Sequence, residues 1–154
     1  ITILRGVHDG YTRMQRSLFH ERAVLVTDDW VAVIDWLHGS GRHRYRSFLH
    51  LHPDVRVETD TKRPLLRLGD RTVVLHSLGT ESVIHEKTEY YPSFGEKVLR
   101  SGFVQQNEAV TPLITGNLFL LRGAAIPVHL DPIAMTVRCI PPGGTEQTVR
   151  SRLF

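Results

Sequence analysis

The chain has 154 residues, of which 41% are apolar and 23% are charged, the composition of an ordinary soluble globular domain. Lysine and arginine exceed aspartate and glutamate by 19 to 16, so the formal net charge of +3 favours anionic partners. No apolar run reaches the ~20 residues of a membrane-spanning helix, and the single cysteine, Cys139, excludes an intrachain disulfide. The chain opens at Ile1 without an initiator methionine or a signal-peptide pattern. We therefore expect a processed protein or a piece of a longer one.

Short strands separated by turn residues are predicted along the whole chain. Apolar or alternating segments occur at residues 1–4, 18–27, 30–37, 44–52, 55–58, 65–68, 71–76, 83–90, 97–106, 113–122, 134–140 and 146–150. The clearest turns are Asp28-Asp29, Gly39-Ser40-Gly41, Gly69-Asp70 and Pro141-Pro142-Gly143-Gly144. Turn chemistry recurs about every 8–12 residues and no stripe of helical period is present. We therefore predict an all-β fold, an antiparallel β-sandwich of the super-sandwich type with about ten strands.

The hairpin from Trp30 to Pro53 is the best-determined part of the prediction. Its first strand, Trp30–Leu37, is apolar almost throughout and rich in β-branched residues, which is typical of a strand buried on both faces. Its second strand alternates, so that one face is apolar and the other carries basic, aromatic and imidazole side chains. The members of this second face are Arg44, Arg46, Phe48, His50 and His52.

His50 and His52 place two imidazoles on one strand face, about 7 Å apart at Cα, as in the metal sites of cupin sheets. Glu58 stands near the place of a third cupin ligand, but the spacing is too long by one or two residues. Asp35 qualifies as a ligand only if it faces the same way, and the neighbouring arginines oppose a dication. We predict no bound metal and no cofactor. A cupin-type metal-dependent enzyme using His50 and His52 is retained as an alternative.

Basic side chains interleave with an aromatic one in the segment Arg42–Arg46. Such a segment can contact a nucleic-acid backbone, can meet uronate carboxylates, or can be an ordinary charged strand end. The aromatic cluster at residues 90–94 is either a sugar-stacking platform or a loop folded on its own core. No nucleophile motif, phosphate-binding glycine loop or Cys-x-x-Cys pair is found, and we interpret Cys139 as a small core residue.

Five short motifs follow one another in a recognisable order. They are His8-Asp9-Gly10-Tyr11, His20-Glu21-Arg22-Ala23-Val24, Trp30 with Asp35, Gly39-Ser40-Gly41-Arg42-His43, and Phe48-Leu49-His50-Leu51-His52-Pro53. This series resembles the C-terminal half of the heparinase II/III-like family. Tyr90–Gly95 and the later Thr111-Pro112 are similar to a further segment of the same domain. The resemblance covers roughly residues 6 to 122.

The resemblance implies polysaccharide lyase chemistry. Family members join an N-terminal α/α toroid to a C-terminal β super-sandwich and cleave acidic glycans by β-elimination at a uronic acid. One group neutralises the uronate carboxylate, and a Tyr or His base removes the acidified C5 proton. In the family these groups and the metal ligands precede the His8–Tyr11 motif, so no catalytic residue is assigned in this chain. His20, Asp35 and His50 mimic a ligand set but match another part of the family pattern, and we do not transfer that role.

The substrate implied by the resemblance is an acidic, uronate-containing polysaccharide, and we predict that five residues bind it. They are His8, Tyr11, Arg42, Arg44 and Arg46, which combine a loop aromatic and imidazole with a basic strand. Residues 1–154 are predicted to be a single β-sandwich domain, the C-terminal fragment of a longer bacterial chain, which walls the substrate cleft and is inactive alone.

The expected partners are the polysaccharide and the missing toroid domain or a companion chain. A homodimer through open sheet edges near Ile1–Leu4 is a further expectation, because unpaired strand edges recruit partners. Nucleic acid and membrane are not expected partners. The expected location is periplasmic or secreted, with a cytoplasmic one left open. The alternative to a lyase part is an independent carbohydrate-binding or structural sandwich.

Overall fold

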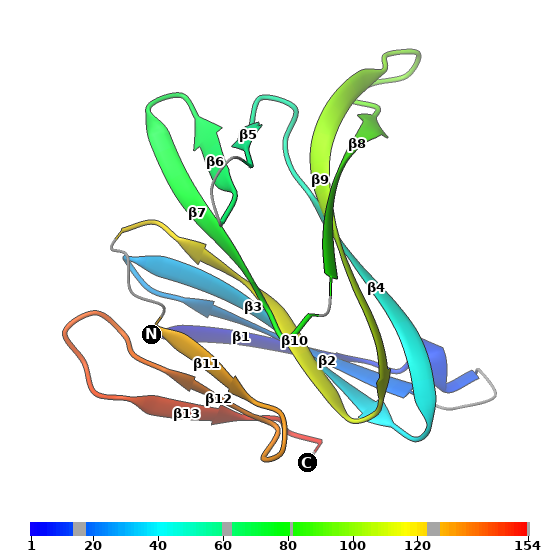
Figure 1. Ribbon diagram of the computed structural model, residues 1–154, viewed down its shortest axis with the longest axis vertical. Helices are drawn as coiled ribbons and strands as arrows, with labels where there is room; N and C mark the ends of the chain where they lie inside the picture. The colour runs from blue at the N-terminus through cyan, green and yellow to red at the C-terminus, as the bar shows by residue number, and fades with distance from the viewer. Residues whose placement is uncertain (14–17, 60–62, 81, 123–126, 154) are drawn as a thin grey trace.

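The computed structural model describes residues 1–13, 18–59, 63–80, 82–122 and 127–153. These residues form thirteen strands and one short 3-10 helix, η1 (Gly10–Arg13), and every strand pairing is antiparallel (Figure 1). The predicted all-β antiparallel sandwich is confirmed, with thirteen strands in place of about ten. No helix within the described ranges is long and apolar enough to cross a membrane.

The strands form three sheets. Sheet A has seven strands in the order β1 (Thr2–His8), β2 (Leu18–Val26), β3 (Trp30–Gly39), β10 (Leu113–Leu120), β7 (Arg71–Leu78), β6 (Leu65–Leu68) and β5 (Arg56–Glu58). Sheet B has the order β4 (Arg42–His50), β9 (Val98–Val110) and β8 (Ser82–Tyr90). Sheet C has the order β11 (Val128–Asp131), β12 (Thr136–Cys139) and β13 (Gln147–Arg150). The strand β11 is the one that the sequence did not predict.

The main core lies between β3 and sheet C. The even-numbered side chains of β3 point to this side and are at most 2% exposed from Trp30 to Trp36. The indole N–H of Trp36 donates to the backbone oxygen of Met135 at 3.0 Å, so its one polar group is satisfied inside the core. The prediction that Cys139 is a core residue is confirmed, because its side chain is fully buried in this cluster.

A second, smaller core joins sheet B to the other face of sheet A. It contains Leu51, Leu66, Leu75 and Phe103. These residues lie toward the β5–β7 end of sheet A, so the β1–β2 end of the same face is left without this apolar cover. Accordingly, the odd-numbered apolar side chains of β3 are only half-buried. The prediction that this strand is buried on both faces is therefore confirmed for the even-numbered face and only in part for the other.

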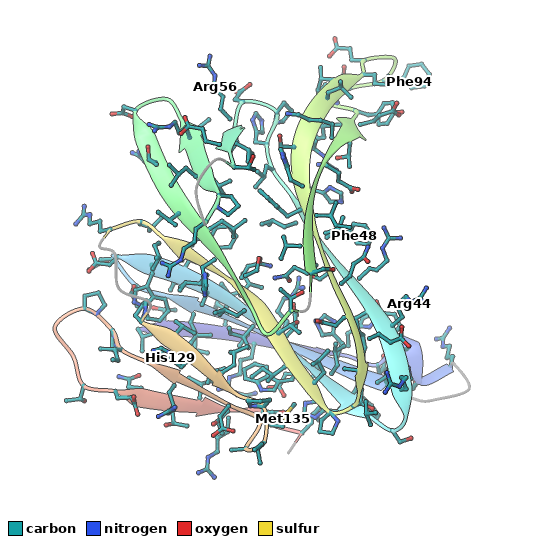
Figure 2. All side chains as sticks on the ribbon, in the orientation of Figure 1. Arg44, Phe48, Arg56, Phe94, His129 and Met135 are labelled. Atoms are coloured by element: carbon teal, nitrogen blue, oxygen red, sulfur yellow. The ribbon has the colours of Figure 1, made fainter. Side chains whose placement is uncertain are left out.

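The β3–β4 hairpin has the predicted turn and the predicted alternation. Gly41 has a φ of 87°, a left-handed conformation that glycine adopts without a steric penalty. Along β4 the side chains alternate between exposed and half-buried, with the even-numbered ones exposed. Figure 2 shows Arg44 and Phe48 on the outer side of β4. The strand itself ends at His50, two residues before the predicted end.

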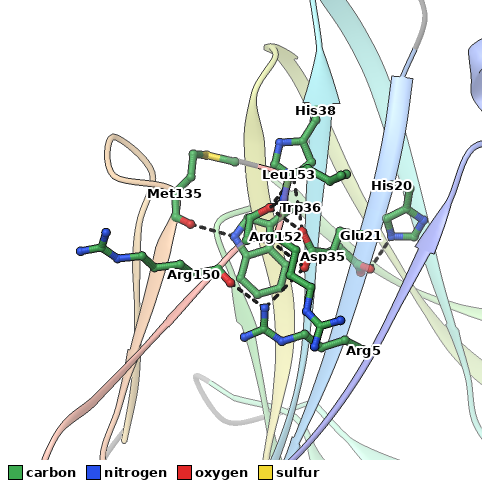
Figure 3. A network of polar contacts seen from close by, with 11 residues as sticks. Arg5, His20, Glu21, Asp35, Trp36, His38, Met135, Arg150, Arg152 and Leu153 are labelled. Carbon is green, nitrogen blue, oxygen red and sulfur yellow. Dashed lines mark hydrogen bonds and ion pairs between the residues drawn. The ribbon is translucent and has the colours of Figure 1, made fainter.

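A buried carboxylate ties the end of the chain to sheet A (Figure 3). Glu21 on β2 is fully buried and accepts hydrogen bonds from the Ser151 hydroxyl and from the Arg152 backbone N–H, the latter at 3.0 and 3.1 Å. The Arg5 guanidinium lies 3.6 Å from this carboxylate, and His38 Nε2 lies 2.9 Å from the Ser151 oxygen. Burial lowers the pKa of His38 against the opposing effect of Glu21. The network fixes the segment after β13 against β2 and β3.

We expect Glu21→Ala to lower the free energy of unfolding by about 3 kcal/mol, because it removes one partner of a buried charged network. The matched control is Glu58→Ala. Glu58 is half exposed in a surface ion pair with Arg67 at 2.6 Å, and its removal should cost less than about 1 kcal/mol. Urea unfolding followed by circular dichroism measures both. Equal losses in the two variants would contradict a special role for the Glu21 network.

Candidate functional site

The uncovered face of sheet A forms a cleft beside the edge strand β4. One hollow of about 490 Å³ lies between β2, β3 and β4, and a second of about 510 Å³ runs along β1 and β2. Tyr11, His20 and Arg22 line both hollows. We refer to the two hollows together as the cleft.

A buried carboxylate with a guanidinium and an imidazole beside it lines the first hollow, and these two neighbours line both hollows. The Asp35 side chain is only 7% exposed, and it accepts hydrogen bonds from Arg22 Nε at 2.6 Å and Arg22 Nη2 at 2.9 Å. His20 Nε2 lies 2.6 Å from the same carboxylate. The β2–β3 register explains this arrangement, because Arg22 is directly opposite Asp35 and His20 follows on the same face two residues away. We call these three side chains the Asp35 cluster.

The charges of Asp35 and Arg22 stabilise each other. Burial raises the pKa of Asp35, but the hydrogen bonds from His20 and Arg22 outweigh burial and hold this pKa below its usual value. The hydrogen bond to Asp35 raises the pKa of Arg22. Arg22 is half exposed, and its Nη1 atom has no partner among the residues that the structure describes. The guanidinium is thus fixed on one side and available to a ligand on the other.

The structure brings together some of the predicted binding residues. Tyr11, Arg44 and Arg46 all border the first hollow, while His8 borders the second, with its ring centroid 5.4 Å from that of Tyr11. Arg42 lies outside both hollows, and its guanidinium is 3.9 Å from Glu108. The binding role of these five residues stays a prediction.

Polar groups from sheet B and β10 complete the wall of the first hollow. Gln105, Asn107 and Thr115 are buried there, and Tyr45 contributes a phenol whose hydroxyl has no hydrogen-bond partner in the described part of the chain. Burial raises the pKa of Tyr45 to about 12, so the phenol is neutral at physiological pH. Buried polar atoms of this kind are normally satisfied by water or by a ligand.

The metal site that the cupin alternative requires is not assembled. The ring centroid of His50 lies 6.1 Å from that of Phe48, and the ring centroid of His52 lies 6.4 Å from that of Tyr90. Glu58 is paired with Arg67. Over the ranges that the structure describes, no three His, Cys, Asp or Glu side chains are grouped so that they could hold a metal ion.

A second polar cluster does not have the geometry of a catalytic triad. Ser151, His38 and Glu21 lie together, but the carboxylate and the imidazole both contact the same hydroxyl. A triad needs the carboxylate to orient the imidazole through its other nitrogen. The Ser151 side chain is also buried, so the cluster is a structural contact.

We did not predict the Asp35 cluster as a site from the sequence, although the hairpin register contained the information that indicates it. The predicted Asp28-Asp29 turn fixes the register of the hairpin that it closes, with Val26 opposite Val31. Counting back one residue at a time along both strands places Arg22 opposite Asp35. An opposite-charge pair directly across two strands on a half-covered face is a detectable feature.

A three-layer antiparallel β-sandwich with an open, arginine-bearing cleft is the class of protein that this fold and site define. Within that class, the model of the heparinase II/III-like C-terminal family matches residues 1–118. The chain belongs to this family, and the resemblance found in its motifs is confirmed.

Solved structures with the same fold include, by their titles, a heparan sulfate lyase and a heparinase III. A heparan sulfate lyase, HepC from Pedobacter heparinus, has a TM-score of 0.66 at 16% identity, covering 98% of this chain and 26% of that one. A heparinase III has a TM-score of 0.67 at 13% identity, covering 96% of this chain and 25% of that one. These identities establish the fold alone, and this chain spans about a quarter of the length of the structures that it matches. No curated protein sequence matches the chain.

The lowered pKa of Asp35 gives a prediction about acid stability. A carboxyl whose pKa is lower in the folded state stabilises the fold above its unfolded pKa of about 4, and this contribution is lost as pH falls through the folded value. Asp35→Asn should therefore cost about 2 kcal/mol at neutral pH and flatten the dependence of stability on pH below about 5. Urea midpoints measured across this range test it.

The control for this experiment is Asp70→Asn, a change of the same chemistry on the exposed β6–β7 turn. Its unfolding curve should follow that of the wild type at every pH. Identical pH profiles for the wild type and Asp35→Asn would contradict the assignment.

Proposed function

We propose that this chain is the C-terminal sandwich part of a longer polysaccharide lyase, and that its cleft is one wall of the site for an acidic, uronate-containing polysaccharide. Membership of the heparinase II/III-like family supports the proposal, as does the fourfold greater length of the lyases that share the fold. The observation that carries it is Arg22, a guanidinium held by buried Asp35 and open to the cleft at Nη1.

The chemistry of the cleft suits an anionic sugar. A carboxylate or sulfate group accepts two parallel hydrogen bonds from a guanidinium. Arg22 is already ordered by Asp35, so it loses little side-chain entropy when an anion binds. Arg44 and Arg46 at the rim make the cleft net positive against the single Asp35 charge, and Tyr11 adds a hydroxyl and an aromatic face.

Cleavage by β-elimination needs a positioned base as well as a group that neutralises the uronate carboxylate. We assign no base in this chain, and we propose that the remaining groups come from an α/α toroid domain or a companion chain. The open edge of β1 is the proposed place for a companion strand or a second copy. A periplasmic or secreted location in a bacterium is part of the same proposal.

An independent carbohydrate-binding sandwich is the second candidate, because the cleft is formed by this chain alone. The two candidates differ in one observable property of the full-length protein. A lyase releases an unsaturated uronate product, whereas a binding module releases none.

The binding prediction concerns the isolated chain and labelled heparin oligosaccharides. Binding should be weak and should decline steeply with added salt, since exposed charges are screened. Asp35→Asn removes an opposing charge but also the carboxylate that fixes Arg22, so it should bind more weakly than a variant that loses the same charge elsewhere, while Arg22→Gln/Asp35→Asn removes the ligand-facing charge as well. We expect the double variant to bind about fivefold more weakly than the wild type, as for loss of one exposed charged contact.

Matched controls separate the site from net charge. Asp70→Asn changes the net charge as Asp35→Asn does, and Asp70→Asn/Arg71→Gln matches the double variant, both at an exposed turn away from the cleft. Fluorescence anisotropy across a salt series measures all five proteins. If each control follows its cleft counterpart, the binding is nonspecific and the proposed cleft function is wrong.

The catalytic prediction is that the isolated chain releases no unsaturated product from heparin-like, chondroitin-like or alginate-like polymers. The measurement is the growth of ultraviolet absorbance of the 4,5-unsaturated uronate. The control is Tyr11→Phe, which removes the one predicted binding phenol. Turnover well above this variant would place the active site inside the chain.

A further inference from the structure

The outer face of sheet B, directed away from sheet A, carries a row of cationic and aromatic side chains. They project from alternate positions of the edge strand β4, so neighbours in the row are about 7 Å apart along the strand. We call this row the β4 ladder; its members are Arg42, Arg44, Arg46, Phe48 and His50. Every member is exposed to solvent, and Arg44 and Phe48 are seen on this side in Figure 2.

Three planar groups of the ladder lie next to one another along β4. The Arg46 guanidinium carbon lies 5.2 Å from the centroid of the Phe48 ring. The Phe48 and His50 rings are 6.1 Å apart at an angle of 9°. Phe48 is nevertheless 50% exposed, so its ring presents apolar surface to solvent in a fixed orientation.

The N–H donors of Arg46 are available within the described part of the chain. No hydrogen bond or ion pair joins its guanidinium to any residue in the described ranges. A guanidinium stacked on a ring keeps its N–H donors in the plane, where a carboxylate or sulfate can accept two of them. Arg44, the next member, is 77% exposed and is only loosely paired with Glu108 at 3.6 Å.

The same face extends beyond β4 with the same chemistry. On β9 the Arg100 guanidinium lies 5.2 Å from the ring centroid of Tyr90 on β8. Among the described residues of this face, four arginines (the three of the ladder and Arg100) stand against Glu86 and Glu108, which gives a net charge of +2.

A purely structural role explains only part of this surface. Val104 is 1% exposed and lies in register between Phe48 and Ile84, so Phe48 covers it. Covering Val104 requires an apolar side chain but neither a stacked arginine without a partner nor an excess of positive charge. These two features favour an anionic ligand with an apolar face.

We propose that the β4 ladder is a second binding surface for anionic glycan. In it a pyranose ring lies on Phe48, and its carboxylate or sulfate group is bound by Arg46 and Arg44. The inference rests on the proposed function and extends it. Since β4 is the edge strand, Arg44, Arg46 and Phe48 also border the cleft, and a polymer that leaves the cleft passes over β4 onto the ladder.

The test measures binding of three probes to the chain: hyaluronan, which is anionic only through carboxylates, heparin, which also carries sulfates, and neutral dextran. We expect Arg46→Gln/Phe48→Leu to weaken binding of the anionic probes about tenfold, from one charged and one stacking contact. Leucine keeps Val104 covered, and Arg46→Gln alone gives a milder second variant. The matched charge control is Arg138→Gln, an exposed position on sheet C.

A loss of affinity for both anionic probes assigns the ladder to carboxylates, and a loss for heparin alone assigns it to sulfates. Unchanged affinity for both, or a loss equal to that of Arg138→Gln, overturns the inference. So does self-association of the chain that the ladder variant abolishes without any effect on glycan binding, because the face is then a protein contact. Circular dichroism and urea midpoints confirm that each variant is folded.

Combining the ladder variant with Arg22→Gln/Asp35→Asn separates this inference from the proposed cleft function. Two contacts on one polymer through residues that do not contact each other should give additive losses of affinity. A loss from the ladder variant alone leaves the ladder standing and removes the proposed role of Arg22. A loss from the cleft variant alone supports the cleft and rejects the ladder. No loss from either variant rejects both proposals.

Discussion

The two faces of strand β3 pack against different surroundings, one apolar and one polar, and most of the structure depends on this difference. Its even-numbered face, with Trp30 and Trp36, is dry and packs against sheet C. Its odd-numbered face buries the Asp35 carboxylate, and a buried charge is tolerated only with partners. Arg22 and His20 on the neighbouring strand are these partners, and the Arg22 side chain is half exposed. A charged cluster on this face is incompatible with a closely packed apolar cover, which agrees with the position of the second core at the other end of the sheet.

The edge strand β4 presents side chains both to the cleft and to the outer surface of the molecule. Because side chains alternate along a strand, Tyr45 points to the cleft side while Arg44 and Arg46 point to the outer side. A central strand could not do this, since both of its neighbours would shield the backbone between the two faces. At an edge, the two faces are separated only by the width of one strand. The proposed cleft and the β4 ladder are therefore adjacent.

The sequence allowed prediction of features that arise from nearby residues. The alternation from Arg44 to His50 and the turn at Gly41 are local, and both were predicted correctly. The order β3-β10-β7 in sheet A and the contact between Glu21 and Ser151, 130 positions apart, depend on distant segments that no local period encodes. The strand Val128–Asp131 was missed because four residues next to a proline carry too little pattern. The Arg22–Asp35 pair lies between these cases, since a correct turn fixed its register.

The two arginine sites differ in a way that bears on how an anionic polymer would be handled. The charge of Arg22 is balanced by Asp35 in direct contact, so its contribution to the proposed binding would be mainly directional: the Nη1 side of its guanidinium is held in a defined place. Arg46 has no such counter-charge among the described residues, so in the proposed binding it would contribute long-range attraction, which speeds encounter and is strongly screened by salt. Attraction by the ladder and orientation by the cleft are thus complementary tasks. In the proposed binding mode, their division between opposite faces of one edge strand would let a single polymer contact both at once.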